Sequence, residues 1–310
     1  MPAYAGPVHP LLADPPTVLA PAEWTAREAA HQARIDTWVV PHQERRRAGI
    51  AHPVWDFLFS YYSQTPNRLR RWHPGAGPVL TGGAASERLG WPMYTAVDGG
   101  VTVDVPAFLA KRRDAVGWVH GLLSATAGRP AQFGCFGLHE WAMLYRPADG
   151  EVRHPLPLRL GQAGTDAVVE QHKVQCSHID AYRFFTRAGT PRNTLTPTRD
   201  TQQQLEQPGC LHATMDLYKW AYKLSPAVPG ELLADCFALA ADVRLLDMRA
   251  SPYDLTGLGW APVSIETPEG KAEYVAAQRG FSARGAALRI RLLDVCRGLL
   301  GEAGRRTVQG

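Results

Sequence analysis

The sequence PGELLADCFALAADVRLLDM, residues 229–248, decides the fold class, because an apolar pattern sustained over so long a run is typical of a packed helix. A second long run, TPEGKAEYVAAQRGFSARGAALRIRLLDVCRGLL at residues 267–300, begins with Thr267 and Pro268, which is a favourable helix start. The segment LYKWAYKL, residues 217–224, is a third helical run. The last third of the chain is therefore expected to be helical.

Helical runs and loops alternate upstream of this region. Residues 22–49 have helical composition, and Pro41 within them is expected to break or kink the helix. A hairpin is predicted over residues 91–105, where β-branched residues surround a Gly-Gly turn. Asp104 is expected to cap a helix that extends to about residue 125.

The middle of the chain is less regular. Residues 133–146 are apolar and fit either a buried strand or a buried helix. Residues 167–175 are expected to form a strand. Ser177 and Asp180 match the spacing of a capping box, which predicts that a helix starts there.

The pattern as a whole predicts a mainly α protein, with an α+β arrangement containing a minor sheet as the variant. Residues 1–21 carry six prolines and are expected to form an N-terminal arm. Residues 22–310 are expected to form a single large, mainly helical globular domain.

Composition narrows the class of protein. Hydrophobic residues make up 45% of the chain, which is enough for a sizeable core, and the net charge of +4 is mildly basic. The five cysteines include no C-x-x-C pair, so a disulfide framework and a zinc ribbon are not supported. Neither a signal peptide nor a membrane-spanning run is recognised, so we expect a cytoplasmic protein with no membrane partner.

Several common enzyme motifs are missing from the sequence. There is no P-loop, no G-x-G-x-x-G fingerprint and no G-x-S-x-G elbow. The H-x-E and P-C-x-x-C signature of zinc-dependent base deaminases is also absent. These absences argue against P-loop nucleotide hydrolysis, dinucleotide binding, α/β-hydrolase chemistry and base deamination.

The first candidate site is the pair His139-Glu140, which lies inside the apolar run FGLHEWAMLY. A charged side chain in such a run is costly to bury unless it is paired or used. A buried Glu140 can act as a general acid or base, and His139 can do the same or bind a metal. The alternative is a hydrogen-bonded core histidine beside an exposed glutamate.

The second candidate is CSHIDAYRFF, residues 176–185. His178 is expected at the first turn of a helix, where it can bind an anion or a metal. Asp180 is interpreted mainly as part of the helix cap with Ser177. Arg183 is expected to pair with Asp180 or to bind an anionic ligand.

The third candidate is QPGCLHATMDLYKW, residues 207–220, in which a turn precedes a helix. His212 and Asp216 are separated by four residues and therefore project from one helical face. Such a pair can fix a tautomer or supply two metal ligands. A surface contact between Asp216 and Lys219 is the competing interpretation.

Metal binding is one way to combine these segments. His139, His178 and His212 are the predicted ligands of a divalent transition metal, and Cys176 and Cys210 extend the set to a mixed Cys/His site. A further cluster of aromatic residues supplies Trp55 and Tyr61 as candidate substrate-binding side chains. Arg183 and Lys219 complete that substrate-binding set.

The segments FGLHEWAMLYR, CSHIDAYRFFT, QPGCLHATMDLYKWAYKL and LLDMRASPYDL resemble a bacterial family commonly labelled 3-methyladenine DNA glycosylase. The resemblance covers most of the chain after His52. It implies hydrolysis of the N-glycosidic bond of an alkylated purine, with the base flipped into an aromatic pocket. The helix-hairpin-helix signature of the large glycosylase superfamily is absent, so no catalytic residue is transferred from it.

Three functional hypotheses follow. The first is a DNA glycosylase with Glu140 or Asp216 as the acid/base carboxylate, three orienting histidines, and DNA or a nucleobase-containing ligand as partner. The second is a metal-dependent enzyme that acts on a small molecule through His139, His178 and His212. The third is a non-catalytic nucleic-acid-binding protein that uses clusters of arginines. The oligomeric state is left open.

Overall fold

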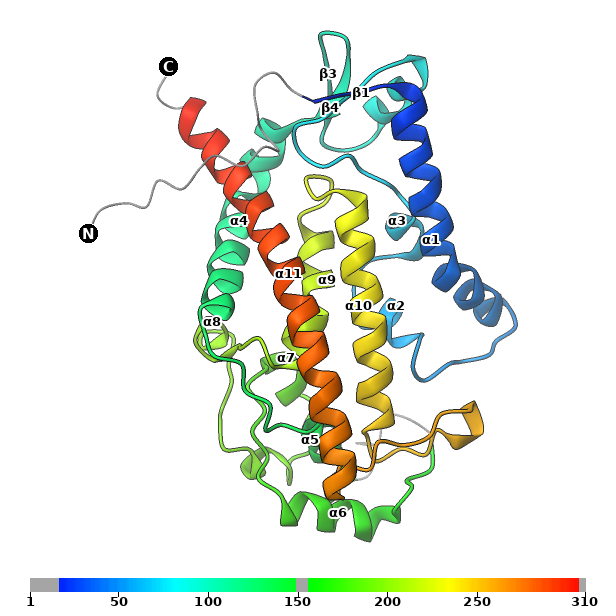
Figure 1. The fold of residues 1–310 in the computed structure, drawn as a ribbon, viewed down its shortest axis with the longest axis vertical. Helices are drawn as coiled ribbons and strands as arrows, with labels where there is room; N and C mark the ends of the chain where they lie inside the picture. The colour runs from blue at the N-terminus through cyan, green and yellow to red at the C-terminus, as the bar shows by residue number, and fades with distance from the viewer. Residues whose placement is uncertain (1–16, 149–155, 307–310) are drawn as a thin grey trace, which may run out of the picture.

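The computed structural model describes residues 17–148 and 156–306, except for the side chains of residues 302–306. It confirms the mainly α prediction, and the minor sheet is present as well. The molecule is elongated, with long helices along its length and the sheet at one end (Figure 1). Of the predicted N-terminal arm, residues 1–16 lie outside the described residues, while Val18–Leu19 form strand β1.

Long helices form the body of the molecule and run side by side (Figure 1). Helix α10 contacts α9, α11 and α1, and α11 also contacts α4 and α9. Each of these helices buries an apolar face against its neighbours, and burial of this kind supplies most of the stability of protein helices. Their bounds are α1 (Pro21–Arg47), α4 (Val105–Ala127), α9 (Leu211–Lys223), α10 (Gly230–Arg249) and α11 (Pro268–Arg306).

The sheet has four strands in the order β1-β2-β4-β3. Strand β1 runs parallel to β2 (Val79–Leu80), and β2 runs antiparallel to β4 (Gly100–Val103). The predicted hairpin is confirmed, because β3 (Tyr94–Val97) and β4 pair antiparallel across a turn formed by Asp98 and Gly99, with Gly100 already in β4. Asp104 caps α4 as predicted, since its Oδ1 accepts a hydrogen bond of 2.9 Å from the backbone N–H of Ala107.

Shorter helices fill the rest of the described chain. Helices α5, α6 and α7 lie in the half of the molecule away from the sheet, with α6 at the far end (Figure 1). Their bounds, and those of the other short α- and 3-10 helices, are α2 (Phe57–Ser60), α3 (Pro66–Leu69), η2 (Gly83–Gly90), α5 (Leu138–Ala142), α6 (Gly161–Gln171), α7 (Ile179–Tyr182), η3 (Thr190–Arg192), α8 (Gln202–Leu205) and η4 (Thr256–Leu258).

One local prediction was wrong, and of the break or kink predicted at Pro41 the break is absent. Residues 167–171 belong to helix α6 rather than to a strand, because Val168 and Val169 are buried together with Thr165, one turn earlier on the same helical face. Pro41 does not break α1, which continues to Arg47. Side chains are buried on both sides of this proline, and this packing offsets the backbone hydrogen bond that it cannot make.

Within the described part of the chain, no helix combines the length and the apolar character that crossing a lipid bilayer requires.

The sheet is joined to the bundle by a tightly packed junction. Trp72 donates a hydrogen bond of 2.9 Å from its indole N–H to Glu231, and the backbone N–H of Gly230 donates to the His73 carbonyl at 2.8 Å. A Cβ atom at Gly230 would lie 2.5 Å from the indole of Trp72, so only glycine fits there. His73 also hydrogen-bonds the Tyr94 hydroxyl at 2.8 Å, which links the start of α10 to β3.

This junction makes the fold sensitive to acid. Burial lowers the pKa of His73 to about 3, below its value in an unfolded chain, so its stabilising contribution is present above about pH 6.5 and is lost as the pH falls. We expect the free energy of unfolding to fall by up to about 1.4 kcal/mol per pH unit between pH 6 and pH 4 from this group. Urea titrations at a series of pH values measure this free energy, and its dependence on pH should be weaker for His73→Gln than for the wild type. An equal dependence on pH in the two proteins would contradict the prediction.

Candidate functional site

The three predicted histidines meet at the end of the bundle away from the sheet. The ring centroids of His139 and His212 are 4.5 Å apart, and those of His178 and His212 are 5.4 Å apart. His139 lies on α5, His178 directly precedes α7, and His212 lies in the first turn of α9. Segments far apart in the sequence therefore bring their imidazoles together around His212.

Two glycines fix the helices that carry these histidines. Gly137 begins α5 with a left-handed φ of +73°, and a Cβ atom there would press against the ring of Tyr274 at 3.3 Å. Gly209 precedes α9, and a Cβ atom there would lie 2.4 Å from the carbonyl oxygen of Gln132. The Gly209 carbonyl also accepts a hydrogen bond of 2.6 Å from Gln278 on α11. Both turns are therefore held in place by the surrounding core.

One group of four side chains has the composition of a metal site. His139, Glu140, His212 and Asp247 each offer one ligand atom, and these atoms all lie within 4.8 Å of one another. His139 Nε2 is 3.0 Å from Asp247 Oδ1 and 3.9 Å from Glu140 Oε1. All four residues are buried, and Asp247 has an exposed fraction of 0%. We call these four residues the central group.

The central group contains polar atoms that the described residues leave without a hydrogen bond. By hydrogen-bond geometry these are His139 Nε2 and both carboxylate oxygens of Asp247, although Nε2 and Oδ1 face each other at 3.0 Å as an ion pair. An unsatisfied buried carboxylate is costly, and a metal ion is one of the few partners that satisfies several converging lone pairs at once. The other ring nitrogen of His139, Nδ1, lies 3.6 Å from Cys135 Sγ, which orients the ring with Nε2 facing the group.

The charges of the central group are strongly coupled. Burial favours the neutral forms, but the facing charges of Asp247 and His139 raise the pKa of His139 well above its ordinary value and lower that of Asp247. Burial and the negative charge of Asp247 raise the pKa of Glu140 to about 7. Burial lowers the pKa of His212 to about 3, so its imidazole is neutral, as metal ligation requires. Arg244 Nη1 lies 3.4 Å from Glu140 and 3.7 Å from Asp247.

A second buried group adjoins the first. His178 Nε2 lies 3.2 Å from Glu206 and 3.3 Å from Asp216, and the three residues also satisfy the spacing of a metal site. Their carboxylates have other partners, however. Lys219 donates to Asp216 at 2.7 Å, and Gln202 donates to Glu206 at 2.6 Å.

The second group is therefore already an ion-pair network. Glu206 raises the pKa of His178 to about 9 against the opposing effect of burial, so the imidazole is protonated at neutral pH. Facing carboxylates raise the pKa of His139 in the central group as well, so protonation of the histidine does not distinguish the two groups. The central group is the stronger candidate for a metal, because among the described residues Asp247 accepts no hydrogen bond like those that Lys219 donates to Asp216 and Gln202 donates to Glu206.

Asp180 has a different role from the one predicted. The expected capping box with Ser177 is absent, because the N-cap of α7 is His178 and no side chain caps this helix. Asp180 instead binds Arg199 and accepts a hydrogen bond of 2.8 Å from Lys219, with Arg183 at 3.3 Å. A helix of four residues offers few free N–H groups, whereas three cations surround the carboxylate.

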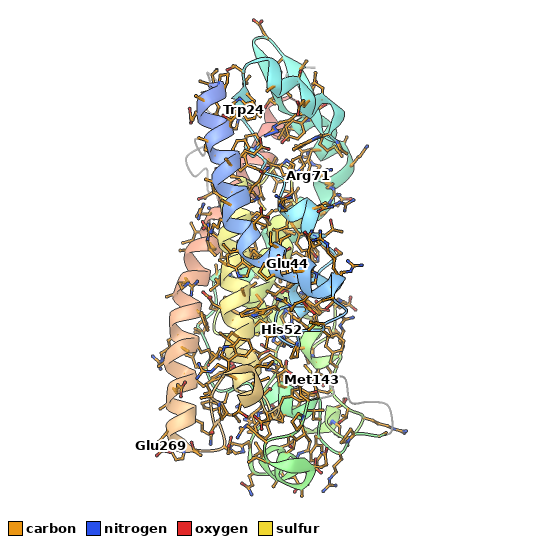
Figure 2. The ribbon with its side chains drawn as sticks, turned by 90° about the vertical axis from the view of Figure 1, so that its right-hand side faces the viewer. Trp24, Glu44, His52, Arg71, Met143 and Glu269 are labelled. Carbon is orange, nitrogen blue, oxygen red and sulfur yellow. The ribbon has the colours of Figure 1, made fainter. Side chains whose placement is uncertain are left out.

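A pocket of about 220 Å³ leads to the central group. Glu140, His212 and Arg244 form its polar part. Met143, which also lines it, lies in the half of the molecule away from Trp24 and the sheet (Figure 2). The remaining lining side chains are mostly aromatic or apolar: Phe57, Ser60, Tyr61, Leu144, Phe184 and Tyr253. A small ligand can therefore reach the central group.

The other predicted residues are placed less uniformly. Tyr61 lines the pocket above the central group, whereas Arg183 and Lys219 line a larger neighbouring pocket together with Tyr61. Trp55 is not brought to either pocket. It lines a separate hollow beside α1 and packs edge-on against Trp260 at a centroid distance of 5.8 Å.

Cysteines surround the histidines but do not join the metal-type groups. Among the described residues, both groups with metal-ligand spacing consist of histidines and carboxylates alone. Cys176 Sγ contacts the His178 carbonyl at 3.6 Å, and burial raises the pKa of this thiol well above its ordinary value. The predicted mixed Cys/His ligand set is therefore not formed.

Sequence analysis missed several members of the site: Glu206, Gln202, Arg199, Arg244 and Asp247. The signal for Asp247 was present, because the run VRLLDM places a carboxylate and an arginine three residues apart among apolar side chains. The same reasoning that selected His139-Glu140 applies to this pair. Glu206 and Arg199 lie in polar, loop-like sequence and give no comparable signal.

Comparisons with known proteins returned no match. No family model, curated protein or solved structure matches this chain. The resemblance to proteins labelled as glycosylases therefore stays a prediction.

The ion-pair network around Lys219 predicts a clear stability difference. Lys219→Met removes the cation shared by Asp180 and Asp216, which have side-chain exposures of 4% and 2%, and should lower the free energy of unfolding by about 3 kcal/mol. Arg284→Met is the matched control, because it breaks an exposed pair with Asp242 and should cost less than about 1 kcal/mol. Chemical denaturation measures both, and equal losses would contradict the assignment of a buried network.

Proposed function

We propose that this protein is a metal-dependent enzyme that acts on a small organic molecule in the pocket above the central group. One observation carries the proposal: His139, Glu140, His212 and Asp247 are all buried and bring four metal-type ligand atoms within 4.8 Å of one another. The pocket that reaches Glu140 and His212 gives a ligand access to the same place. A purely structural cluster requires no such access.

The donor set indicates the class of metal. Two imidazoles and two carboxylates suit iron, manganese, cobalt or zinc better than the hard cations magnesium and calcium, which prefer oxygen ligands alone. A metal bound by His139, His212, Asp247 and Glu140 would supply Lewis-acid activation of a substrate or of a water molecule. The identity of the metal separates hydrolytic from oxidative chemistry, because zinc is redox-inactive.

The protein's own side chains supply the rest of the site. Arg244 is held over the ring of Phe57 at 4.0 Å and faces the pocket beside Glu140, so it can bind a negatively charged group of a substrate. The aromatic walls exclude water and orient the apolar part of a ligand. The free thiols favour a reducing compartment, and we therefore propose a cytoplasmic location.

Metal analysis tests this proposal directly. Protein purified without chelators should contain a transition metal in stoichiometric amount, measured by inductively coupled plasma mass spectrometry. His212→Ala and Asp247→Asn should each lower the bound metal about tenfold or more, because each removes a ligand.

The control is His120→Ala, which removes a partly exposed histidine of α4 that belongs to neither group. It should keep the metal content of the wild type. Circular dichroism of each variant separates loss of metal from loss of fold. Folded wild-type protein that binds no metal after incubation with iron(II), manganese(II), cobalt(II) or zinc(II) would overturn the proposal.

Release of an alkylated base from DNA is the second candidate. The observation in its favour is that the rings of Phe57, Tyr61, Phe184 and Tyr253 surround a pocket containing the carboxyl group of Glu140. Glycosylases use aromatic pockets of this kind to hold a flipped base and a carboxylate to assist bond cleavage.

A base-release assay on alkylated DNA distinguishes the two candidates. If the second candidate holds, protein treated with a chelator should still release the base, and Glu140→Gln should lower the rate by about 100-fold. If the metal-dependent proposal holds, neither the chelator-treated nor the untreated wild-type protein should release base above the background rate of the DNA alone. Measuring metal content in the same samples ensures that the chelator has worked.

A further inference from the structure

A second, larger pocket of about 690 Å³ adjoins the first. Tyr61 lines both pockets, so the two hollows meet at this side chain. The larger pocket lies between α4, α7 and α9, and it falls within the size range of about 300–1,000 Å³ typical of small-molecule sites.

The lining of this pocket carries an excess of positive charge. Five cationic side chains line it, and Asp180 is the acidic side chain that lines it with them. Asp180 pairs with several of the cations, and Asp216 behind it pairs with Lys219, but two carboxylates do not neutralise five cations. The five are Arg112, Arg183, Arg199, Lys219 and Lys223.

Arginines on the bundle surface are arranged differently. Arg27 pairs with Glu231 at 2.8 Å, and Arg284 pairs with Asp242 at 2.7 Å. Arg70 pairs with Asp36 at 2.6 Å. These three surface arginines each have an acidic partner, whereas the cations that line the pocket outnumber the carboxylates beside them.

Aromatic rings form the apolar part of the same pocket. Trp118 and Trp220 lie 5.1 Å apart, and Tyr61 and Tyr62 lie 4.8 Å apart, measured between ring centroids. The ammonium group of Lys223 lies 5.4 Å from the Trp220 ring. The nearby positive charges of Lys219 and Arg199 add to the effect of burial and lower the pKa of Lys223. Cations and aromatic faces therefore occur together in one hollow.

We propose that this pocket binds a small organic molecule through a phosphate group, with Arg183, Arg199 and Lys223 as its cationic contacts. Asp180 engages Nη1 and Nη2 of Arg199 and Nε of Arg183, so the remaining N–H groups of these two guanidiniums are the ones that donate to phosphate oxygens. The exposed Lys223 adds a point charge. The aromatic rings hold the organic part of the molecule. That this molecule is also the substrate rests on the metal-dependent function, because the contact at Tyr61 connects the phosphate pocket to the central group.

Calorimetric titration with phenyl phosphate and with inorganic pyrophosphate tests the proposal. Both should bind saturably to the full chain at low ionic strength and more weakly as salt is added. Benzyl alcohol, which lacks the charge, should bind at least about tenfold more weakly than phenyl phosphate, and benzoate separates recognition of phosphate from recognition of any anion. Absence of saturable binding by both phosphate-bearing probes, or equal binding of benzoate, would overturn it.

Variants localise the binding. Lys223→Gln and Arg199→Gln should each weaken phenyl phosphate about fivefold to tenfold, whereas Arg284→Gln on the α11 surface should bind as the wild type does. A single-stranded oligonucleotide could also bind more tightly than phenyl phosphate, with its binding weakened by the same variants. That result would identify nucleic acid, rather than a small molecule, as the ligand of the pocket. Metal content is measured in the same samples. If the protein binds phenyl phosphate but no metal, the phosphate pocket is supported and the proposed metal-dependent function is refuted. If it binds metal but no phosphate-bearing probe, the metal-dependent function is supported and the phosphate pocket is refuted.

Discussion

Asp247 is fully buried at the end of α10, and among the described residues its two carboxylate oxygens have no hydrogen-bond partner of good geometry. Placing an ionised carboxylate in the core is expensive unless an opposite charge compensates it. His139 on α5 at 3.0 Å and Arg244, one turn earlier on α10, at 3.7 Å supply part of that compensation. The arrangement of α5, α9 and α10 therefore depends on how this one charge is neutralised. A metal ion completes that neutralisation in our account.

The rest of the architecture places ligand access next to this charge. The sheet and its junction with α10 lie at the far end of the molecule, so they stabilise the bundle without blocking the site (Figure 1). The central group opens into a small aromatic pocket, and the adjoining network around Asp180 and Lys219 borders a larger basic one. Tyr61 stands between the two pockets. A small molecule with a negatively charged end and an aromatic or apolar body fits these two adjoining pockets, one basic and one aromatic.

Sequence alone predicted the long helices well, because apolar periodicity over many turns has few alternative explanations. It also predicted the β3–β4 hairpin and the Asp104 cap, where local turn and capping chemistry decides the outcome. It failed at residues 167–171 and at Asp180, where short segments take their structure from tertiary contacts rather than from local preference. The convergence of His139, His178 and His212 was a hypothesis that only the fold could test. Asp247 was not predicted as a site residue, although a carboxylate within an apolar helical run indicates a buried group that is paired or functional.

The central claim is that the central group binds a metal ion. Crystals of protein loaded with a transition metal, measured at the absorption edge of that metal, locate it by its anomalous scattering. We expect one strong peak at about 2.0–2.2 Å from His139 Nε2 and from an oxygen of Asp247, with His212 and Glu140 completing the coordination. A fully loaded protein whose only peaks lie elsewhere, with the Asp247 carboxylate hydrogen-bonded to protein groups or water, would contradict the account.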